Sequence, residues 1–522
     1  MTTADTHNSA AFNHKELMML HRISLMLIKD HDFNKLFGKI LDSAIVYTNA
    51  EGATIYMVDE DNNTLKFIKV FNSRLKVSMG SEEINWPPVN LFKEDGEENL
   101  NNLAALCYHR HKSFNFPDVY EQNTFDSSGT KDYDLRNGYR TKSIVAIPMV
   151  DHKSNVIGVI QLINALDNNH CVIPFNASVV KNLEILTSIS AILLNNHKLI
   201  IDLQTSFNQF IKAIAWAIDR KSKHFSGHIA RVSELVNSFA EKINEYQGNE
   251  SKFGRVHFSD DELEEIKIAG LMHDIGKIIT PMHILDKSSK LEKIFDRIEL
   301  VQERIDHLKT KVEFAFYQKN LTIEGKNDYY KNLEEFEQFL IRINKGREFL
   351  SDQDLEYLQK IKDYILKING KEYSIITDDE FYNLKIRRGT LNQEDLDIIR
   401  EHAYVTGKVL SQIKFPQYIQ NAPLFAEQHH EKLNGKGYPN GLDASQIPLQ
   451  SRILAIADVF EALTAVRPYK ESKKLTETYS ILRKMIENCE IDADLFDFAI
   501  LTGLFQEYAH HHLRADLIDT DK

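Results

Sequence analysis

The stretch SDDELEEIKIAGLMHDIGK, which begins at Ser259, predicts a helix in the C-terminal half of the chain. Ser259 with Glu262 three residues later is the signature of a capping box, so a helix is expected to begin there. His273 and Asp274 stand at its far end, and Gly276 is expected to end the helix. Because successive helical side chains diverge by about 100°, an adjacent His-Asp pair can serve two metal ions at once. The stretch therefore predicts a helix that closes with two metal ligands.

Other residues with metal-binding side chains lie before and after this stretch, each within a helical pattern or at its end. Taken singly, any one of these histidines is more often structural or exposed than a ligand. As a set they suit iron, manganese or zinc, which imidazole and carboxylate groups bind alike. Two such ions, about 3.5–4 Å apart, can activate a phosphoryl group. The candidates are His224, His228, His402, His429, His430 and Asp458.

A second stretch, HHEKLNGKGYPNG at residues 429–441, places two histidines side by side and then uses three glycines and a proline. Adjacent histidines cannot share one helix face, so they either diverge or address two things at once. The glycines indicate that backbone, rather than side chain, comes close to another group.

Composition describes an ordinary globular chain of two or three domains, with 522 residues, 43% hydrophobic and 27% charged. The net charge of −13 argues against DNA or RNA as a partner, because phosphate binding needs a basic face. Three scattered cysteines fit a reducing compartment. We find neither a signal peptide nor an apolar run of about 18 residues, and we expect a cytoplasmic protein with no membrane segment.

The N-terminal part, residues 15–195, is expected to be an α+β domain, preceded by a disordered segment at 1–14. Two pairs of strand-like runs, each joined by a polar turn, predict an antiparallel sheet flanked by helices. The pairs are Ala53–Val58 with Thr64–Phe71, and Ser143–Val150 with Val156–Asn164. This order resembles a GAF domain, a small sensor fold, and the resemblance implies a regulatory role without naming a ligand.

A long helix is expected from Asn176 onward, because apolar residues recur at intervals of three and four. Its continuation, residues 196–210, is expected to be a helical linker. The apolar seam either pairs with a second copy or packs on the domain's own sheet. We favour a parallel homodimer through the GAF-like domain and this helix.

The motifs HDIGK, HHEKLNGKGYP and ADVFEALT with RPYK together resemble the HD-GYP family of HD phosphohydrolases. The resemblance implies an all-α domain, residues 211–508, that hydrolyses the bacterial messenger cyclic di-GMP to linear pGpG and on to GMP. It also implies two or three divalent metal ions, commonly iron or manganese, with zinc permitted. The ligands that it assigns are His228, His273, Asp274, His402, His429, His430 and Asp458.

The same resemblance assigns further roles in the site. Asp274 is expected to bridge two ions, and Lys277 to contact the reacting phosphate; these are the candidate catalytic residues. His429 and His430 are expected to diverge toward different ions. His224 either ligates a third ion or is exposed. The residues implied to contact substrate are Lys277, Gly437, Tyr438, Pro439, Arg467 and Lys470.

Residues 290–370 exceed what the fold needs, and their heptad pattern predicts an inserted helical hairpin or small bundle. The seam is expected to run from Ile294 to Val312, and a third helix to reach Ile365. This insertion either binds a protein partner or only stabilises the fold. Residues 509–522 are expected to be a tail.

Two other functions remain open. One is a phosphohydrolase acting on another cyclic nucleotide, such as a cyclic mononucleotide or a hybrid cyclic dinucleotide. The other is a catalytically silent module that binds cyclic di-GMP or a protein. The complete ligand set favours the phosphodiesterase.

Overall fold

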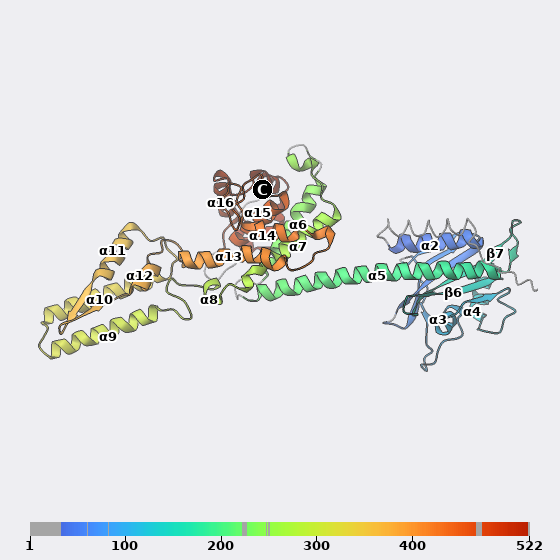
Figure 1. Ribbon diagram of the computed structural model, residues 1–522, viewed down its shortest axis with the longest axis horizontal. Coiled ribbons are helices and arrows are strands. Elements are labelled where there is room, and N and C mark those ends of the chain that lie inside the picture. Colours follow the sequence, from blue (N-terminus) through green and yellow to red (C-terminus); the bar gives the residue numbers. More distant parts are fainter. Residues whose placement is uncertain are drawn as a thin grey trace, which may run out of the picture. The chain divides into compact units, whose positions relative to one another are not determined.

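The computed structural model describes residues 33–59, 61–81, 83–221, 227–246, 248, 251–465 and 472–519. The chain divides into two compact units, Met1–Ser206 and Phe207–Lys522 (Figure 1). The predicted disordered segment at 1–14 lies outside the described residues.

The N-terminal unit is built on an antiparallel sheet whose strands follow the order β3-β2-β1-β7-β6-β5, with β4 on β2 and β8 on β7. Both predicted hairpins are confirmed, since β1 pairs with β2 and β6 pairs with β7. The strands are β1 (Ala50–Asp59), β2 (Thr64–Asn72), β3 (Val77–Gly80), β4 (Val89–Asn90), β5 (Phe114–Phe116), β6 (Ile144–Val150), β7 (Val156–Leu166) and β8 (Val172–Ile173).

Helices cover both faces of this sheet. Successive side chains of a strand point to opposite faces, and here buried apolar side chains lie on both. Ile55 and Ile147 share a core with α2 (Phe33–Thr48) and the start of α5, whereas Tyr56 and Ala146 pack toward α3 (Leu103–Arg110). Figure 1 shows α2 and α5 on one side of the sheet, with α3 and α4 (Ser128–Asn137) on the other. The predicted α+β architecture is confirmed.

Helix α5 (Ala177–Asp219) is the long helix expected after Asn176, and the boundary between the units falls within it. Leu183 and Leu194 belong to the core of the first unit, and Ile211 and Ala215 to that of the second. By length and composition α5 could also cross a membrane, with a hydropathy of 1.5 in its most apolar window. This is weak evidence, because a helix that supplies protein cores passes the same test.

The C-terminal unit packs helices around a core that contains Phe239, Phe460, Phe498 and Phe505, with the rings of Phe460 and Phe505 stacked 4.0 Å apart. Its helices are α6 (His228–Glu245), α7 (Asp260–Met272), α8 (Met282–Leu285), α13 (Gln393–Leu410), α14 (Ala422–Glu427), α15 (Leu449–Thr464), α16 (Leu475–Glu487), α17 (Ala493–Leu501) and α18 (Leu504–His512). Short 3₁₀ turns join them: η1 (Lys252–Arg255), η2 (Ile275–Ile278), η3 (Gln417–Ile419), η4 (Gln428–His430) and η5 (Ala515–Leu517).

The predicted ends of two helices need correction. The capping box of Ser259 and Glu262 is present, but α7 ends at Met272 rather than at Gly276. The His-Asp pair therefore lies in the turn after the helix. At the C-terminus the expected tail from residue 509 is wrong, since α18 continues to His512 and Leu517 is buried.

The insertion forms a helical bundle with its own hydrophobic core, as predicted, but this core continues to Leu384 instead of ending near residue 370. Its elements are α9 (Ile298–Tyr317), α10 (Ile323–Asn344), α11 (Asp352–Asp363), β9 (Ile365–Ile368), β10 (Lys371–Ser374) and α12 (Asp378–Leu384). The hairpin of β9 and β10 departs from the all-α prediction. Ile365, which was expected to belong to the third helix, is the first residue of β9. Ile294 precedes α9 and is 93% exposed, so it is not part of the seam.

Candidate metal centre

The seven predicted ligands lie together within the C-terminal unit, where their ligand atoms form overlapping groups with separations under 4.8 Å. They come from five places in the chain: the first residue of α6, the turn after α7, the middle of α13, the turn η4 and the last half of α15. The groups are His402 with His429 and His430, His228 with His273 and Asp458, and His273 with Asp274 and His429.

Asp274 lies between these groups. Its Oδ2 is 3.3 Å from His273 Nε2 and 3.5 Å from His228 Nε2, whereas its Oδ1 is 3.5 Å from His402 Nε2. The two oxygens of one carboxylate therefore face two sets of imidazoles. Such a carboxylate can be shared by two ions.

Three of the histidines are held in one orientation by their own backbone. In each, Nδ1 lies 2.5–2.7 Å from the carbonyl oxygen three residues earlier, which favours a proton on Nδ1 and leaves Nε2 as the ligand atom. The pairs are His273 with Gly270, His402 with Ile399 and His429 with Ala426.

The fourth ring, that of His228, is held by a carboxylate instead. Its Nδ1 contacts Oε2 of Glu461, which is fully buried on α15 one turn after Asp458. The other oxygen of Glu461 accepts hydrogen bonds from Arg231, at 2.8 Å from Nε and 2.6 Å from an Nη atom. The His228 ring thus has a carboxylate behind it, an arrangement typical of metal-bound imidazoles.

A glycine and a threonine bring the His-Asp turn against α13. A Cβ atom on Gly276 would lie 1.9 Å from the carbonyl oxygen of His402, so only glycine fits at this position. The hydroxyl of Thr406 accepts from the Gly276 N–H at 3.0 Å and donates to the His273 carbonyl at 2.9 Å. These contacts set His402 beside Asp274.

The charge states of the cluster suit divalent cations. Burial lowers the pKa of His402, His429 and His430, that of His430 to about 3, so these rings are neutral and able to donate to a metal. Burial opposes ionisation of Asp274, but Lys277 and the neighbouring imidazoles hold its pKa well below the usual range. The centre therefore combines neutral imidazoles with an ionised carboxylate.

Two buried atoms of the cluster support this fit directly. Within the described residues, His273 Nε2 and Asp274 Oδ1 have no hydrogen-bond partner. A buried polar atom without a partner costs about 1–3 kcal/mol, and metal ligation would remove that cost. The donor set thus fits divalent metal ions, although it does not select one element.

His228 differs from the other rings in its charge. Burial opposes its protonation, but the carboxylates of Glu461, Asp274 and Asp458 raise its pKa well above the ordinary value. A metal ion at Nε2 would replace the proton there, because a cation and a proton compete for the same lone pair.

Lys277 also lies at the centre. It belongs to η2, and its Nζ is 2.6 Å from Asp274 Oδ2. The ammonium group therefore places a positive charge beside the carboxylate that faces both sets of imidazoles.

The rings of His429 and His430 lie close together, with centroids 4.0 Å apart, and both belong to the group that contains His402. His429 also belongs to the group with His273 and Asp274, whereas His430 does not. That the two rings address different ions stays a prediction. They lie in a 3₁₀ turn after α14, not on a regular helix, so the helical argument for divergence does not apply.

Glu431 holds the glycine-rich loop, residues 435–441, close to the metal centre. This buried carboxylate accepts hydrogen bonds from three successive backbone N–H groups, those of residues 440, 441 and 442, at 2.6, 3.2 and 2.9 Å. A Cβ on Gly437 would lie 2.3 Å from the backbone nitrogen of Lys432, which explains that glycine. The Tyr438 ring then lies 4.8 Å from that of His430, and Tyr438–Pro439 is a cis peptide.

Three predicted site residues, His224, Arg467 and Lys470, lie outside the described residues. The sequence analysis missed four that support the site: Arg231, Thr406, Glu431 and Glu461. Glu461 and Thr406 stand one helical turn after the predicted ligands Asp458 and His402, which is a signal that could have been used. Arg231 carries the same signal, because it stands one helical turn after the predicted ligand His228 on α6. Glu431 carries no comparable signal, because its hydrogen-bond partners are backbone N–H groups of the following loop.

Residues 225–368 and 376–495 match HD domain families. Over 112 residues the chain is 39% identical to 3'3'-cGAMP-specific phosphodiesterase 1 of Vibrio cholerae. The matched segment covers 22% of this chain and 25% of that protein. The chain is 40% identical over 87 residues to the cyclic di-GMP phosphodiesterase response regulator RpfG of Xanthomonas campestris, and this match covers 17% of this chain and 23% of that protein.

A third relative, the cyclic di-GMP phosphodiesterase of Thermotoga maritima, is 36% identical over 94 residues, covering 18% of this chain and 25% of that protein. The chain thus spans about a quarter of the length of each of these relatives.

Among solved structures, the N-terminal part is similar to the GAF domain of an Acinetobacter phosphoenolpyruvate-protein phosphotransferase, with 14% identity and a TM-score of 0.28, over 37% of this chain and 99% of that one. At this TM-score the likeness adds nothing to the strand order described above. The sequence matches are to HD domains, and they cover the segments that bear all seven clustered residues. The C-terminal unit of this chain is therefore an HD-domain unit.

Proposed function

We propose that the chain is a metal-dependent phosphodiesterase that hydrolyses a cyclic dinucleotide, cyclic di-GMP, to linear pGpG and on to GMP. The observation that carries this proposal is the Asp274 carboxylate with its two oxygens facing two sets of imidazoles. Relatives named cyclic di-GMP phosphodiesterases support the choice of substrate. The metal that we propose is iron or manganese, as two or three ions.

The residues have separate tasks in this proposal. His228, His273, His402, His429, His430, Asp274 and Asp458 would hold the ions, which supply the positive charge and the activated water that phosphodiester hydrolysis needs.

Lys277 would bind a non-bridging oxygen of the phosphate, because its ammonium lies 2.6 Å from the carboxylate shared by both groups. Most of the barrier reduction would then come from position and charge rather than from a covalent intermediate.

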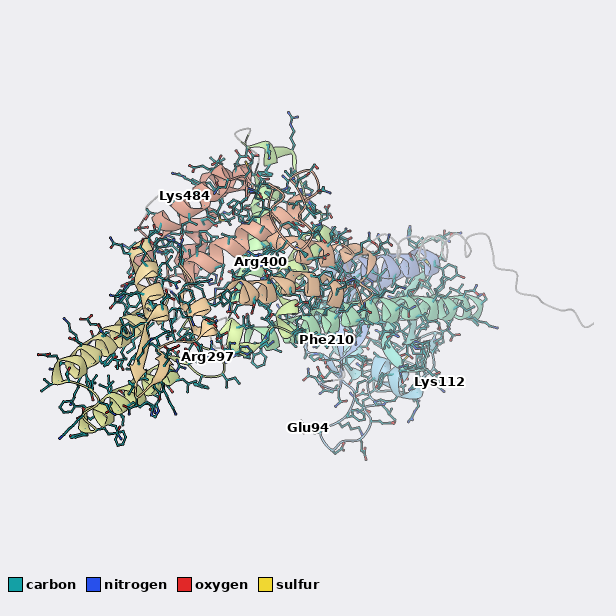
Figure 2. The ribbon with its side chains drawn as sticks, turned by 60° about the vertical axis from the view of Figure 1, so that its left-hand side comes forward. Glu94, Lys112, Phe210, Arg297, Arg400 and Lys484 are labelled. Atoms are coloured by element: carbon teal, nitrogen blue, oxygen red, sulfur yellow. The ribbon has the colours of Figure 1, made fainter. Side chains whose placement is uncertain are left out.

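Substrate would be held by the loop at Gly437, Tyr438 and Pro439. The Tyr438 ring, beside His430, offers a flat apolar surface at the rim of the centre. Arg400 on α13, labelled in Figure 2, lies with its guanidinium 5.8 Å from the centroid of that ring. It would add a cation for a second phosphate or for a guanine base, alongside Arg467 and Lys470.

A hybrid substrate is the second candidate. The relative from Vibrio cholerae is named as specific for 3'3'-cGAMP, which has the same ring of two phosphodiesters and differs in one base. The metal centre would treat both alike. The choice between them would depend on contacts to the bases at the rim.

The test is turnover by chain purified anaerobically, followed by chromatography on cyclic di-GMP, 3'3'-cGAMP and cyclic AMP, with iron, manganese and zinc counted per chain. We expect cyclic di-GMP to be cleaved, and His273→Ala with Asp274→Ala to abolish cleavage while helical circular dichroism is retained. His510→Ala with Asp516→Ala, both exposed, is the matched control. Cleavage by the first double variant would refute the assignment, and preference for 3'3'-cGAMP would select the second candidate.

The N-terminal unit would regulate this activity, and two chains would associate through it and α5 in the cytoplasm. Support for association comes from apolar side chains that are exposed on α5 and recur at intervals of seven or four residues, as in a helix-pairing seam. They are Ile185, Ile192, Leu199, Leu203 and Phe210, the last of which is labelled in Figure 2. The insertion would offer a surface to a protein partner.

A further inference from the structure

The last turn of α5 is hydrogen-bonded to the start of α6. Asp219 ends α5 and is buried. One oxygen of its carboxylate accepts from the Gly227 N–H at 2.9 Å, and the other accepts from the Ile229 N–H at 3.3 Å. These two residues flank His228, so a side chain of α5 fixes the backbone on both sides of a predicted metal ligand.

A second contact joins the end of α5 to the turn that carries Lys277. The Nζ of Lys221 lies 2.7 Å from the carbonyl oxygen of Lys277, 2.5 Å from that of Ile278 and 2.7 Å from that of Thr280. An ammonium group has three donors, and here each has an acceptor in one short segment. Lys221 therefore holds η2 from outside while the Lys277 side chain points to Asp274.

The two contacts meet at one place. Asp219 and Lys221 line the same small cavity as Asp274 and Lys277. The end of α5 thus reaches both the segment that begins with His228 and the segment that follows Asp274. Neither Asp219 nor Lys221 belongs to a motif named in the sequence analysis, which gave them no role.

We propose that Asp219 and Lys221 are positioning residues for the metal centre, through which the end of α5 sets where His228 and Lys277 stand. The proposal rests on the proposed function for its catalytic half, since it assigns Lys277 to the phosphate. Its metal half, the placement of His228, does not depend on the substrate.

The physical reason is that a helix end moves as a rigid piece. Lys221 stands two residues after α5, and its N–H donates to the Ile218 carbonyl at 3.0 Å. A shift or rotation of the last turn of α5 would therefore displace Asp219 and Lys221 together, and so would change the start of α6 and the turn η2 in one step. Misplacement of a reacting group by about 1 Å can cost as much as 100-fold in rate. The two residues therefore offer a direct route by which the position of α5 controls catalysis.

The experiment compares substitutions that remove each contact with substitutions that keep it. Asp219→Ala removes both acceptors, whereas Asp219→Asn keeps an acceptor oxygen; Lys221→Met removes all three donors, whereas Lys221→Arg keeps donors. Lys212→Met, which removes an exposed ammonium from the same helix, is the control. Mn²⁺ affinity of the metal-stripped chain, melting temperature and kcat at saturating metal are measured for each.

We expect Asp219→Ala to weaken Mn²⁺ binding by about tenfold or more, in the range known for groups that orient metal ligands. We expect Asp219→Asn to recover part of that loss, because the amide keeps one of the two acceptors. We expect Lys221→Met to lower kcat by about tenfold or more, with Mn²⁺ affinity changed by less than about threefold, and Lys221→Arg to recover part of kcat. In a Lys277→Met background, Lys221→Met should have little further effect, because its action passes through Lys277.

Three results would overturn the proposal: Mn²⁺ affinity of Asp219→Ala within about twofold of the parent, equal losses in the alanine and asparagine variants accompanied by a lower melting temperature, or an undiminished effect of Lys221→Met in the Lys277→Met background. If the parent chain cleaves none of the cyclic nucleotides, the proposed function fails, and the Mn²⁺ titration of the Asp219 variants alone decides the inference.

Discussion

Glu461 offers a sharp test of how the metal centre is supported, because it contacts His228 and is not among the predicted ligands. Replacing it with glutamine keeps the size of the side chain but removes the negative charge behind the His228 ring. In the parent, one carboxylate oxygen accepts from Arg231 and the other lies against His228 Nδ1. A glutamine amide has only one acceptor oxygen, so it can accept from one of these two groups but not from both. The ring should lose its fixed orientation and part of its basicity.

The size of the effect follows from the contacts. Groups that orient a metal-bound histidine are worth about 10–100-fold in metal affinity, or about 1.4–2.7 kcal/mol. Glu461→Ala should cost more, because it also leaves Arg231 without its carboxylate. Breaking a buried ion pair costs about 3–5 kcal/mol, but the Arg231 side chain is 29% exposed, so solvent should reduce that penalty to the lower end.

The assay is calorimetric titration of the metal-stripped chain with Mn²⁺, with thermal unfolding measured on the same samples. Glu507→Gln is the matched control, because Glu507 also pairs with a basic side chain, Lys242, but on the exposed surface of α18. We expect the control to bind as the parent does. An affinity for Glu461→Gln within about threefold of the parent would refute the supporting role of this carboxylate.

Two further predictions concern stability. Burial lowers the pKa of Lys290 in the insertion from 10.5 to about 8, so between these values the unfolded chain binds the additional proton and stability should rise with pH, by on the order of 3 kcal/mol in all. Urea unfolding followed by circular dichroism should show this rise in the parent and a smaller one in Lys290→Met; equal slopes would contradict it. Gly276→Ala should lower both melting temperature and Mn²⁺ affinity, because its Cβ would meet the backbone of His402 at 1.9 Å and of Thr406 at 2.7 Å. Gly129→Ala, where a Cβ meets nothing within 4 Å, should change neither, and a Gly276→Ala protein that behaves like this control would show that α13 yields easily.

Local signals in the sequence were sufficient for much of the fold. Strand pairs joined by polar turns predicted β1 with β2 and β6 with β7, and a capping box predicted the start of α7. Each of these rests on residues within a few positions of one another. The end of α7 was misplaced because the turn η2 depends on Thr406, which approaches from α13 and is remote in sequence.

The clustering of the seven candidate residues was predictable, whereas the long-range groups around them were not. Each candidate ligand stands in a motif of a few residues, and three of the rings are held locally by a carbonyl three residues earlier. The partners of His228 are set by the tertiary fold. The Nδ1 of His228 contacts a residue more than two hundred positions away, and the N–H groups on either side of His228 are held from α5. Spacing along a single helix shows which residues share a face, and does not show which other helix that face meets.

In the insertion, too, the sequence pattern shows which helix face is apolar but not what that face packs against. A heptad pattern in α9 says that one face is apolar, and it is equally compatible with a partner chain or with the insertion itself. The structure resolves this for the seam, because Val301, Ile305 and Leu308 pack in a core shared with Leu333 and Phe336 of α10. A protein partner would therefore have to bind a different surface of the bundle, and substitutions in the seam would unfold the insertion rather than report on binding.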